Sequence, residues 1–147
     1  MYSEKTEAHY LNPYKEGKLV NITSFGTAED KQRGEKITFW ILAKDNKIQQ
    51  ISFEAEGSCA LIAVGSSITT LVEGKEEREA FHVSFTKINE ELGGLPWEKL
   101  ECIELGKMAL QKAIIEDYKK QQKELDELCL EKTCMKECLV LKEEEQK

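Results

Sequence analysis

Three short stretches in the first half of the chain have the hydrophobic and polar pattern of β-strands. Residues 19–25 alternate well enough for one strand, and residues 37–42 and 48–53 are two more, because they are rich in residues that favour strands. The last two stretches are separated by Lys44-Asp45-Asn46-Lys47, a short polar link whose Asp and Asn favour a tight turn. We therefore predict three strands, the second and third of which form a hairpin. The charged residues 29–35 before the second strand are interpreted as a solvated loop.

From residue 58 onward, hydrophobic residues recur at helical spacing. A helix is predicted from Ser58, the expected N-cap, to a stop at Gly74, because hydrophobic residues lie three or four apart at Leu61, Val64, Ile68 and Leu71. Two further helices are predicted at about residues 76–92 and from Cys102 to about residue 122, and a short helix precedes the Asn12-Pro13 turn. Strands followed by helices indicate an α+β domain with a three-stranded antiparallel sheet packed against helices.

Cys102 follows a segment that cannot be helical. Gly93, Gly94 and Pro96 interrupt the helical pattern, so residues 95–99 are predicted to form an exposed loop and Cys102 to lie at a helix N-terminus. Free N–H groups and the positive end of the helix dipole favour a thiolate there, which suits a metal ligand or a sulfur nucleophile. A small buried hydrophobic residue is the alternative. Position alone slightly favours that alternative, whereas the rest of the chain favours the ligand or nucleophile, and we therefore expect a thiolate.

Cys59 is predicted in the first turn of the helix that Ser58 caps, so a second cysteine lies at a helix N-terminus. The two histidines, His9 and His82, have no neighbouring ligand residue in the sequence. We interpret both as packing or solvent-facing residues.

Composition limits the classes of function. A chain of 147 residues is long enough for one domain with its own core. Its net charge of -7 argues against DNA or RNA as a partner, since nucleic-acid binding relies on Lys and Arg at the phosphates. The sequence contains neither a signal-peptide core at its start nor a run of membrane-spanning length. We therefore expect a cytoplasmic protein with no membrane partner, whose five cysteines are reduced thiols.

The last residues differ in character from the rest of the chain. We predict a domain at residues 1–122 and a charged, helix-prone extension at residues 123–147, which contains Cys129, Cys134 and Cys138. The spacing of these cysteines matches no zinc-ribbon or ferredoxin signature. They are expected to pack either the extension itself or a contact between subunits. A contact between subunits would make the protein a homo-oligomer.

Four segments together resemble the iron–sulfur cluster scaffold proteins of the NifU/IscU type. They are the opening His9-Tyr10 with Asn12-Pro13, residues 53–57 with the helix that follows, residues 95–102, and residues 112–122. Their order and spacing are similar to those of the family over about residues 7–122. The resemblance implies the NifU/IscU-like fold and a non-enzymatic role.

The resemblance also implies a set of site residues. Family members hold a cluster or a metal with three cysteines and an aspartate, the last in a Cys-Gly-Asp turn. Here that turn is Arg33-Gly34-Glu35, the second cysteine position carries Ser58 with Cys59 beside it, and Cys102 matches the third cysteine. The implied ligands are therefore Cys59, Cys102 and Glu35, which would bind iron or a [2Fe-2S] cluster, with zinc as an alternative to iron. The implied partners are a cysteine desulfurase and recipient apo iron–sulfur proteins.

The loop before Cys102 resembles the chaperone-recognition loop of the family in part. Members served by a dedicated Hsp70-type chaperone carry Leu-Pro-Pro-Val-Lys, and Leu95, Pro96 and Lys99 match that pattern. The two intervening residues are Trp97 and Glu98, which differ from the Pro-Val of the family pattern. This change in the middle of the loop argues against an Hsp70-type chaperone as a partner, although the flanking residues match.

Three classes of function follow from these observations. The leading one is a scaffold or carrier that accepts sulfur from a cysteine desulfurase and binds iron or a [2Fe-2S] cluster. The alternative is a degenerate paralogue that binds or regulates the desulfurase or scaffold machinery without holding a cluster. A thiol-dependent transferase with Cys102 as nucleophile is the weakest, because no base is evident near a cysteine.

The site itself is predicted to gather at one end of the domain. We expect the thiols of Cys59 and Cys102 to lie near one another and near Glu35. Arg33 is expected to border the site, where its guanidinium would lower the pKa of neighbouring thiols, or else to pair on the surface with Glu35 or Glu29.

Overall fold

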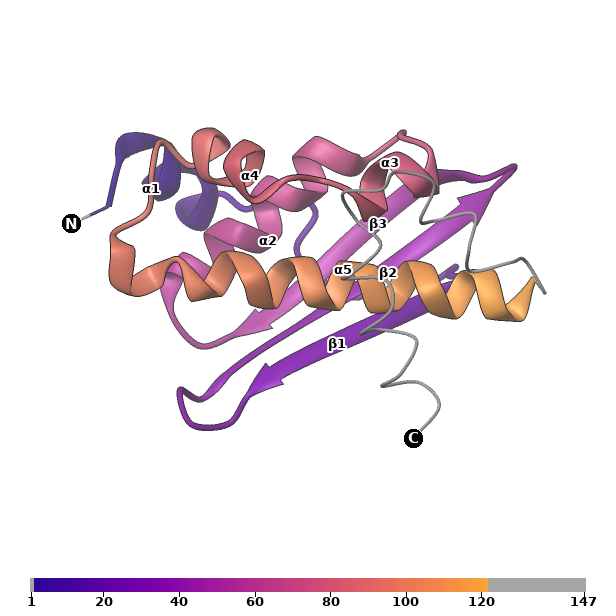
Figure 1. The fold of residues 1–147 in the computed structure, drawn as a ribbon, viewed down its shortest axis with the longest axis horizontal. Coiled ribbons are helices and arrows are strands. Elements are labelled where there is room, and N and C mark those ends of the chain that lie inside the picture. Colours follow the sequence, from indigo (N-terminus) through magenta and orange to yellow (C-terminus); the bar gives the residue numbers. More distant parts are fainter. Residues whose placement is uncertain (1, 122–147) are drawn as a thin grey trace.

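The computed structural model describes residues 2–121, which form a three-stranded sheet covered on one face by helices (Figure 1). In chain order the elements are α1 (Glu4–Leu11), β1 (Ser24–Asp30), β2 (Glu35–Lys44), β3 (Lys47–Glu56), α2 (Cys59–Val72), α3 (Glu77–Phe81), α4 (Phe85–Glu91), the 3₁₀ helix η1 (Trp97–Lys99) and α5 (Glu101–Lys120). The predicted α+β architecture is confirmed. The predicted helical extension at residues 123–147 lies outside the described residues.

The sheet is antiparallel, with β2 between β1 and β3. The predicted β2–β3 hairpin is confirmed, and Lys44 pairs with Lys47 at its end. Asp45 and Asn46 form the two-residue turn with φ values of 55° and 65°. These left-handed conformations are those that Asp and Asn tolerate better than most residues.

The prediction for the first strand was wrong at both ends. β1 runs from Ser24 to Asp30, so only its start overlaps the predicted residues 19–25, and the predicted charged loop shrinks to the turn before Glu35. The N–H of Gly17 donates to the carbonyl of Phe53 in β3, whereas the N–H of Thr23 donates to the carbonyl of Ile41 in β2. The residues between Gly17 and Thr23 therefore pass from one edge of the sheet toward the other. Their alternation of hydrophobic and polar residues does not correspond to a strand.

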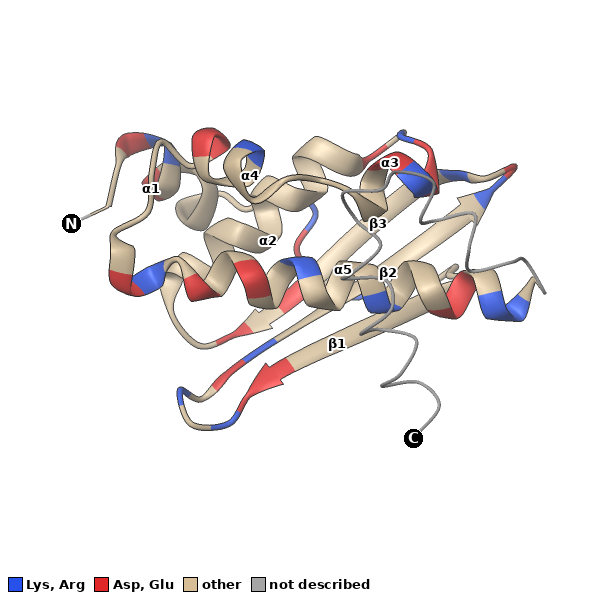
Figure 2. Ribbon diagram, in the orientation of Figure 1, with Lys and Arg blue, Asp and Glu red and all other residues tan. Residues whose placement is uncertain are grey.

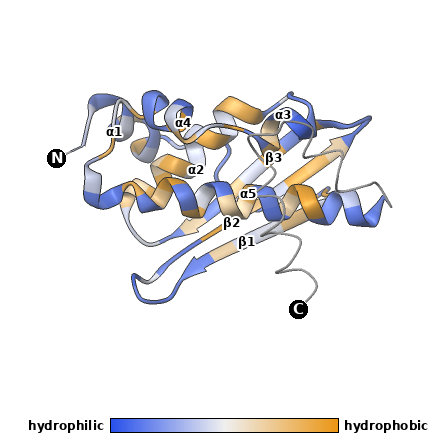
Figure 3. Ribbon diagram, viewed as in Figure 1, coloured by the Kyte–Doolittle hydropathy of each residue, from blue (hydrophilic) through white to orange (hydrophobic). Residues whose placement is uncertain are grey.

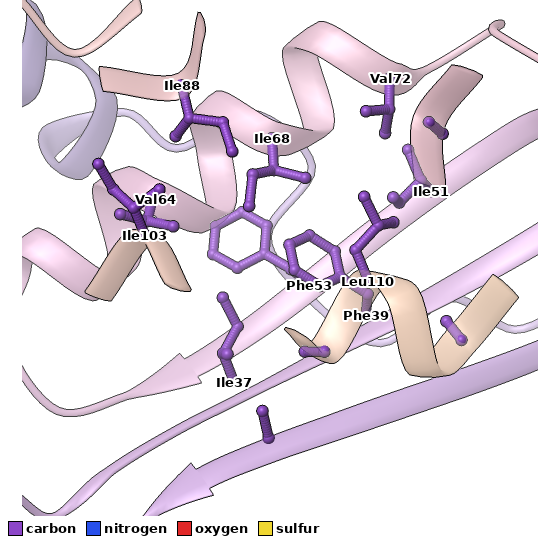
Figure 4. Close-up of a cluster of buried hydrophobic side chains, with 14 of the residues drawn as sticks. Ile37, Phe39, Ile51, Phe53, Val64, Ile68, Val72, Ile88, Ile103 and Leu110 are labelled. Atoms are coloured by element: carbon purple, nitrogen blue, oxygen red, sulfur yellow. The ribbon is translucent and has the colours of Figure 1, made fainter. Parts of the chain in front are cut away.

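Helices α5 and α2 supply most of the cover, with α5 against β1 and β2 and α2 against β3. Hydrophobic residues are concentrated in α2 and in the strands (Figure 3). The core lies between these layers. Figure 4 shows two of its side chains, Phe53 from β3 and Ile68 from α2. The rings of Phe39 and Phe53, on neighbouring strands, lie 6.2 Å apart.

The helix predicted at residues 76–92 is divided into two. α3 ends at Phe81 and α4 begins at Phe85, because the Ser84 hydroxyl accepts a hydrogen bond from the N–H of Lys87 and caps a new helix. The two pieces also have different neighbours, since α3 packs on α5 while α4 contacts both α2 and α5.

The predicted loop at residues 95–99 is only partly exposed. Leu95 is buried, Trp97 is 82% exposed, and Trp97–Lys99 form the short helix η1. Helix α5 begins at Glu101, so Cys102 lies in its first turn as predicted. No helix within residues 2–121 has the length and hydrophobicity needed to cross a membrane.

Candidate functional site

Three polar side chains from separate elements meet at the N-terminal end of α5. The Cys102 thiol donates to Glu35 Oε2 at 3.2 Å, and the Ser58 hydroxyl donates to Glu35 Oε1 at 3.2 Å. Ser58 Oγ also lies 3.8 Å from Cys102 Sγ. We call Glu35, Ser58 and Cys102 the thiol–carboxylate site. Positions far apart in the sequence thus form one cluster at one end of the domain, as predicted for Glu35 and Cys102.

Local backbone geometry places these side chains. Gly34, with a φ of +68°, ends the β1–β2 turn immediately before Glu35. Gly57, with a φ of +135°, precedes Ser58, and a Cβ at Gly57 would lie 2.8 Å from Glu35 Cγ. Ser58 then caps α2 by accepting a hydrogen bond from the N–H of Leu61. A glycine at position 57 therefore allows the β3–α2 turn to pass directly beside Glu35.

The Cys102 thiol is fully buried, and its surroundings favour the protonated form. Burial is the largest effect and, with the hydrogen bond and negative charge of Glu35, raises the pKa of Cys102 to about 11. The Ser58 hydroxyl and the charge of Lys99 act in the opposite direction but are weaker. The expectation of a thiolate at this helix N-terminus was wrong, because burial beside a carboxylate outweighs the helix dipole.

Arg33 lies beside the site but does not touch its thiol or its carboxylate. Its Nη2 is 3.2 Å from Glu101 Oε2, and its Nε is 3.9 Å from Asp30 Oδ2. The expected surface partners, Glu35 and Glu29, are replaced by Glu101 and Asp30. Glu101 was missed as a partner, although it directly precedes Cys102 in the sequence.

Cys59 is exposed, unlike Cys102. Within residues 2–121, no hydrogen bond joins Cys59 to the thiol–carboxylate site, and no three His, Cys, Asp or Glu side chains are grouped to hold a metal ion. The structure therefore brings together Glu35 and Cys102 and adds Ser58 to them. A ligand role for Cys59 remains a prediction. Cys129, Cys134 and Cys138 lie outside the described residues.

The two histidines have the packing roles expected for them. His9 Nδ1 lies 2.7 Å from Ser66 Oγ, and His9 Nε2 lies 3.2 Å from Glu91 Oε1. These contacts hold α1 against α2 and α4. The His82 ring packs edge-on against Phe81.

The chaperone-like residues Leu95, Pro96 and Lys99 follow α4 and lead into α5. Leu95 is buried and its N–H donates to Asn89 Oδ1 at 2.8 Å. The exposed feature of this loop is the Trp97 side chain, at the position where the family pattern differs. A partner that recognises this loop would therefore meet an indole.

Comparisons with known proteins agree on one family. The NifU-like N terminal domain matches residues 1–125. An iron-sulfur cluster assembly scaffold protein IscU of Archaeoglobus fulgidus is 37% identical over 134 residues, covering 90% of this chain and 88% of the relative. The IscU scaffold protein of Aquifex aeolicus is 34% identical over 138 residues, covering 92% of this chain and 87% of the relative.

Solved structures share the fold at lower sequence identity. A putative iron-sulfur cluster assembly scaffold protein for the SUF system from Fervidobacterium islandicum matches with a TM-score of 0.66 and 18% identity, over 77% of this chain and 96% of the other. A NifU-like protein (N-terminal) from Brucella abortus matches with a TM-score of 0.63 and 16% identity, over 80% and 94%. These matches show the same fold.

Proposed function

Because the chain belongs to the family of NifU-like N-terminal domains, we propose that it is a non-enzymatic scaffold in iron–sulfur cluster assembly. The observation that carries this proposal is the contact of 3.2 Å between Cys102 Sγ and Glu35 Oε2. A thiolate and a carboxylate are both ligands that iron accepts in proteins. Cys102 and Glu35 also stand at the positions where the family pattern has its third cysteine and its aspartate.

We propose further that iron and sulfur are the cargo of this site. A cysteine desulfurase that carries a persulfide would transfer its outer sulfur to the deprotonated Cys102: the new S–S bond forms as the persulfide S–S bond breaks, and the desulfurase cysteine leaves as a thiolate. Glu35, which lies 3.2 Å from Cys102 Sγ, would take the thiol proton that must leave before Cys102 can accept sulfur or bind iron. The exposed Cys59, next to Ser58 at the start of α2, would add a second thiol after local rearrangement. Iron or a [2Fe-2S] cluster is the proposed cargo, with zinc as an alternative to iron. Recipient apo iron–sulfur proteins in the cytoplasm would take the product.

The cargo needs ligands beyond the thiol–carboxylate site. A [2Fe-2S] cluster has four ligand positions, and Cys59, Cys102 and Glu35 supply three. The fourth would come from Cys129, Cys134 or Cys138, from a second copy of the chain, or from a partner.

A second candidate is a degenerate paralogue that regulates the desulfurase or a complete scaffold. Two family cysteine positions carry Arg33 and Ser58, and Arg33 is held in ion pairs with Glu101 and Asp30. A permanently charged guanidinium cannot bind iron. In this case the protein would bind its partners without cargo.

Anaerobic reconstitution with ferric iron and sulfide separates the two candidates. For a scaffold we expect visible absorbance and stoichiometric iron and acid-labile sulfide, with most of both lost in Cys102→Ser and part lost in Cys59→Ser. The triple variant Cys129→Ser, Cys134→Ser, Cys138→Ser tests the extension as the source of the fourth ligand. A colourless wild-type chain that still binds a desulfurase would replace our proposal with the degenerate paralogue.

The same assay has a gain-of-function arm. The double variant Arg33→Cys with Ser58→Cys restores the cysteines of the family pattern, so it should retain more iron and sulfide per chain than the wild type. Arg33→Ala should not, because it adds no ligand, and Arg78→Cys controls for an added surface thiol on α3. If the double variant gains nothing and Cys102→Ser loses nothing, clusters are not bound at this site.

A further inference from the structure

Two links join the start of β2 and its preceding turn to the first turn of α5. The inner link is the hydrogen bond between Cys102 and Glu35, and the outer link is the ion pair between Arg33 and Glu101. Glu101 directly precedes Cys102 in α5, and Arg33 lies two positions before Glu35. The same two segments are therefore held together twice.

Exposure increases from the inner link to the outer one. Cys102 is 0% exposed and Glu35 is 5% exposed, whereas the side chains of Arg33 and Glu101 are 35% and 68% exposed. The Arg33–Glu101 pair is therefore the solvent-accessible link of the two, and the Cys102–Glu35 pair is the buried one. Figure 2 shows charges of both signs at this end of the molecule, on the β1–β2 turn and at the start of α5.

Arg33 is directed toward α5 by its own turn. Its backbone N–H donates to Asp30 Oδ1 at 3.3 Å, and its Nε lies 3.9 Å from Asp30 Oδ2. Asp30 thereby holds both the backbone and the side chain of Arg33, while Nη2 remains to reach Glu101. This arrangement limits the freedom that Arg33 loses when the ion pair forms.

We infer that Arg33 is a positioning residue whose ion pair with Glu101 closes access to the Cys102 thiol, and that this pair must open before Cys102 can receive sulfur or iron. This inference rests on the proposed function for the reason that the Arg33–Glu101 pair opens, namely the delivery of sulfur or iron. The closed arrangement itself is argued only from the Arg33–Glu101 and Cys102–Glu35 contacts. An exposed ion pair is weak and is screened by salt. It is therefore suited to a closure that a charged partner can displace.

Alkylation of Cys102 measures this closure without iron or sulfide. Iodoacetamide is uncharged, so salt does not steer it, and mass spectrometry of peptides gives the rate at each cysteine separately. Arg33→Ala should raise the Cys102 rate about two- to fivefold, because a weak exposed pair is lost. Raising the ionic strength should increase the Cys102 alkylation rate of the wild type by a similar factor, because salt screens the ion pair. It should change the Cys102 rate of Arg33→Ala very little. The rate at the exposed Cys59 should stay constant throughout and reports any general loosening of the fold.

Matched variants distinguish the ion pair from other effects of substitution. Lys31→Ala removes a cation from the same turn that forms no ion pair with the described residues, and it should leave the Cys102 rate unchanged. Reversing the pair with Arg33→Glu and Glu101→Arg together should restore the slow rate that Arg33→Glu alone loses. The inference is overturned if Cys102 reacts equally fast in the wild type and in Arg33→Ala, or if salt accelerates both to the same extent. Neither outcome bears on cluster binding, which the reconstitution assay decides.

Discussion

The Cys102 thiol experiences opposing influences on its pKa. Its position in the first turn of a long helix favours the thiolate, while its complete burial and its contact with Glu35 favour the thiol. Burial and Glu35 together dominate, so at neutral pH Cys102 keeps its proton and donates it in the hydrogen bond to Glu35. The proposed chemistry therefore begins with removal of a proton, for which Glu35 is the adjacent acceptor.

This pKa makes the stability of the fold depend on pH above 9. The folded pKa of about 11 exceeds the ordinary value of 9.0, so the folded state holds the proton more tightly than the unfolded state. The resulting stability is fully present below pH 9 and is lost as pH rises toward 11. Between pH 8 and 10.5 the loss should be about 2 kcal/mol.

Urea unfolding of the wild type and of Cys102→Ser at both pH values measures this loss. The serine variant keeps a hydrogen-bond donor that does not titrate in this range, so the difference in unfolding free energy between the two proteins should shrink by that amount. A difference that stays constant from pH 8 to 10.5 would mean that the Cys102 pKa is not raised by folding.

At the scale of elements, β1 and α5 approach one another closely enough to require a glycine. A Cβ at Gly26 would lie 2.3 Å from the backbone N of Ala113 and 2.4 Å from the backbone O of Ala109. Backbone atoms of a packed helix cannot move aside as a side chain can. The position of α5 on the sheet, and with it the position of Cys102, therefore depends on this residue.

Gly26→Ala should lower the free energy of unfolding by about 2–3 kcal/mol, because the added methyl group overpacks the β1–α5 contact. Gly106→Ala is the matched control within α5. Its Cβ would meet Val64 Cγ1 at 2.6 Å and Ile68 Cδ1 at 2.9 Å, which are side-chain atoms and can shift with less disturbance than a helix backbone, and alanine favours the helix. Urea unfolding should show the smaller loss for Gly106→Ala, and equal losses would contradict the backbone explanation.

At the scale of the whole molecule, we propose that residues 1–122 are a self-contained domain. The described hydrophobic core extends from Ala28 to Tyr118, near the end of α5. A chain that ends at Gln122 should therefore unfold in urea within about 0.5 kcal/mol of the full chain, as for changes away from the core. A chain that ends at Ile115 loses the buried Tyr118 and should be clearly less stable. A large loss on truncation at Gln122 would assign the extension at 123–147 a part in the fold.

Features that depend on nearby residues could be predicted from the amino-acid sequence. The β2–β3 hairpin follows from Asp45 and Asn46, whose side chains suit its turn. The start of α2 at the Ser58 cap and the interruption of helix at Gly93, Gly94 and Pro96 are also local effects. The antiparallel sheet followed by helices could be predicted from these elements, because turn chemistry and hydrophobic periodicity act over a few residues.

Features that depend on residues distant in sequence could not be predicted, because they arise only when the chain folds. Residues 19–23 alternate like a strand, yet the pairing of Gly17 with Phe53 and of Thr23 with Ile41 makes them cross the sheet. Arg33 could be placed near the site, but its partner Glu101 arises only when the β1–β2 turn meets α5.

The protonation of Cys102 belongs to the same class. It was mispredicted because a helix N-terminus can be recognised in the sequence, whereas burial beside a carboxylate 67 positions away cannot. The desolvation that raises the pKa exists only after the β-sheet, the β3–α2 turn and α5 have closed around the thiol.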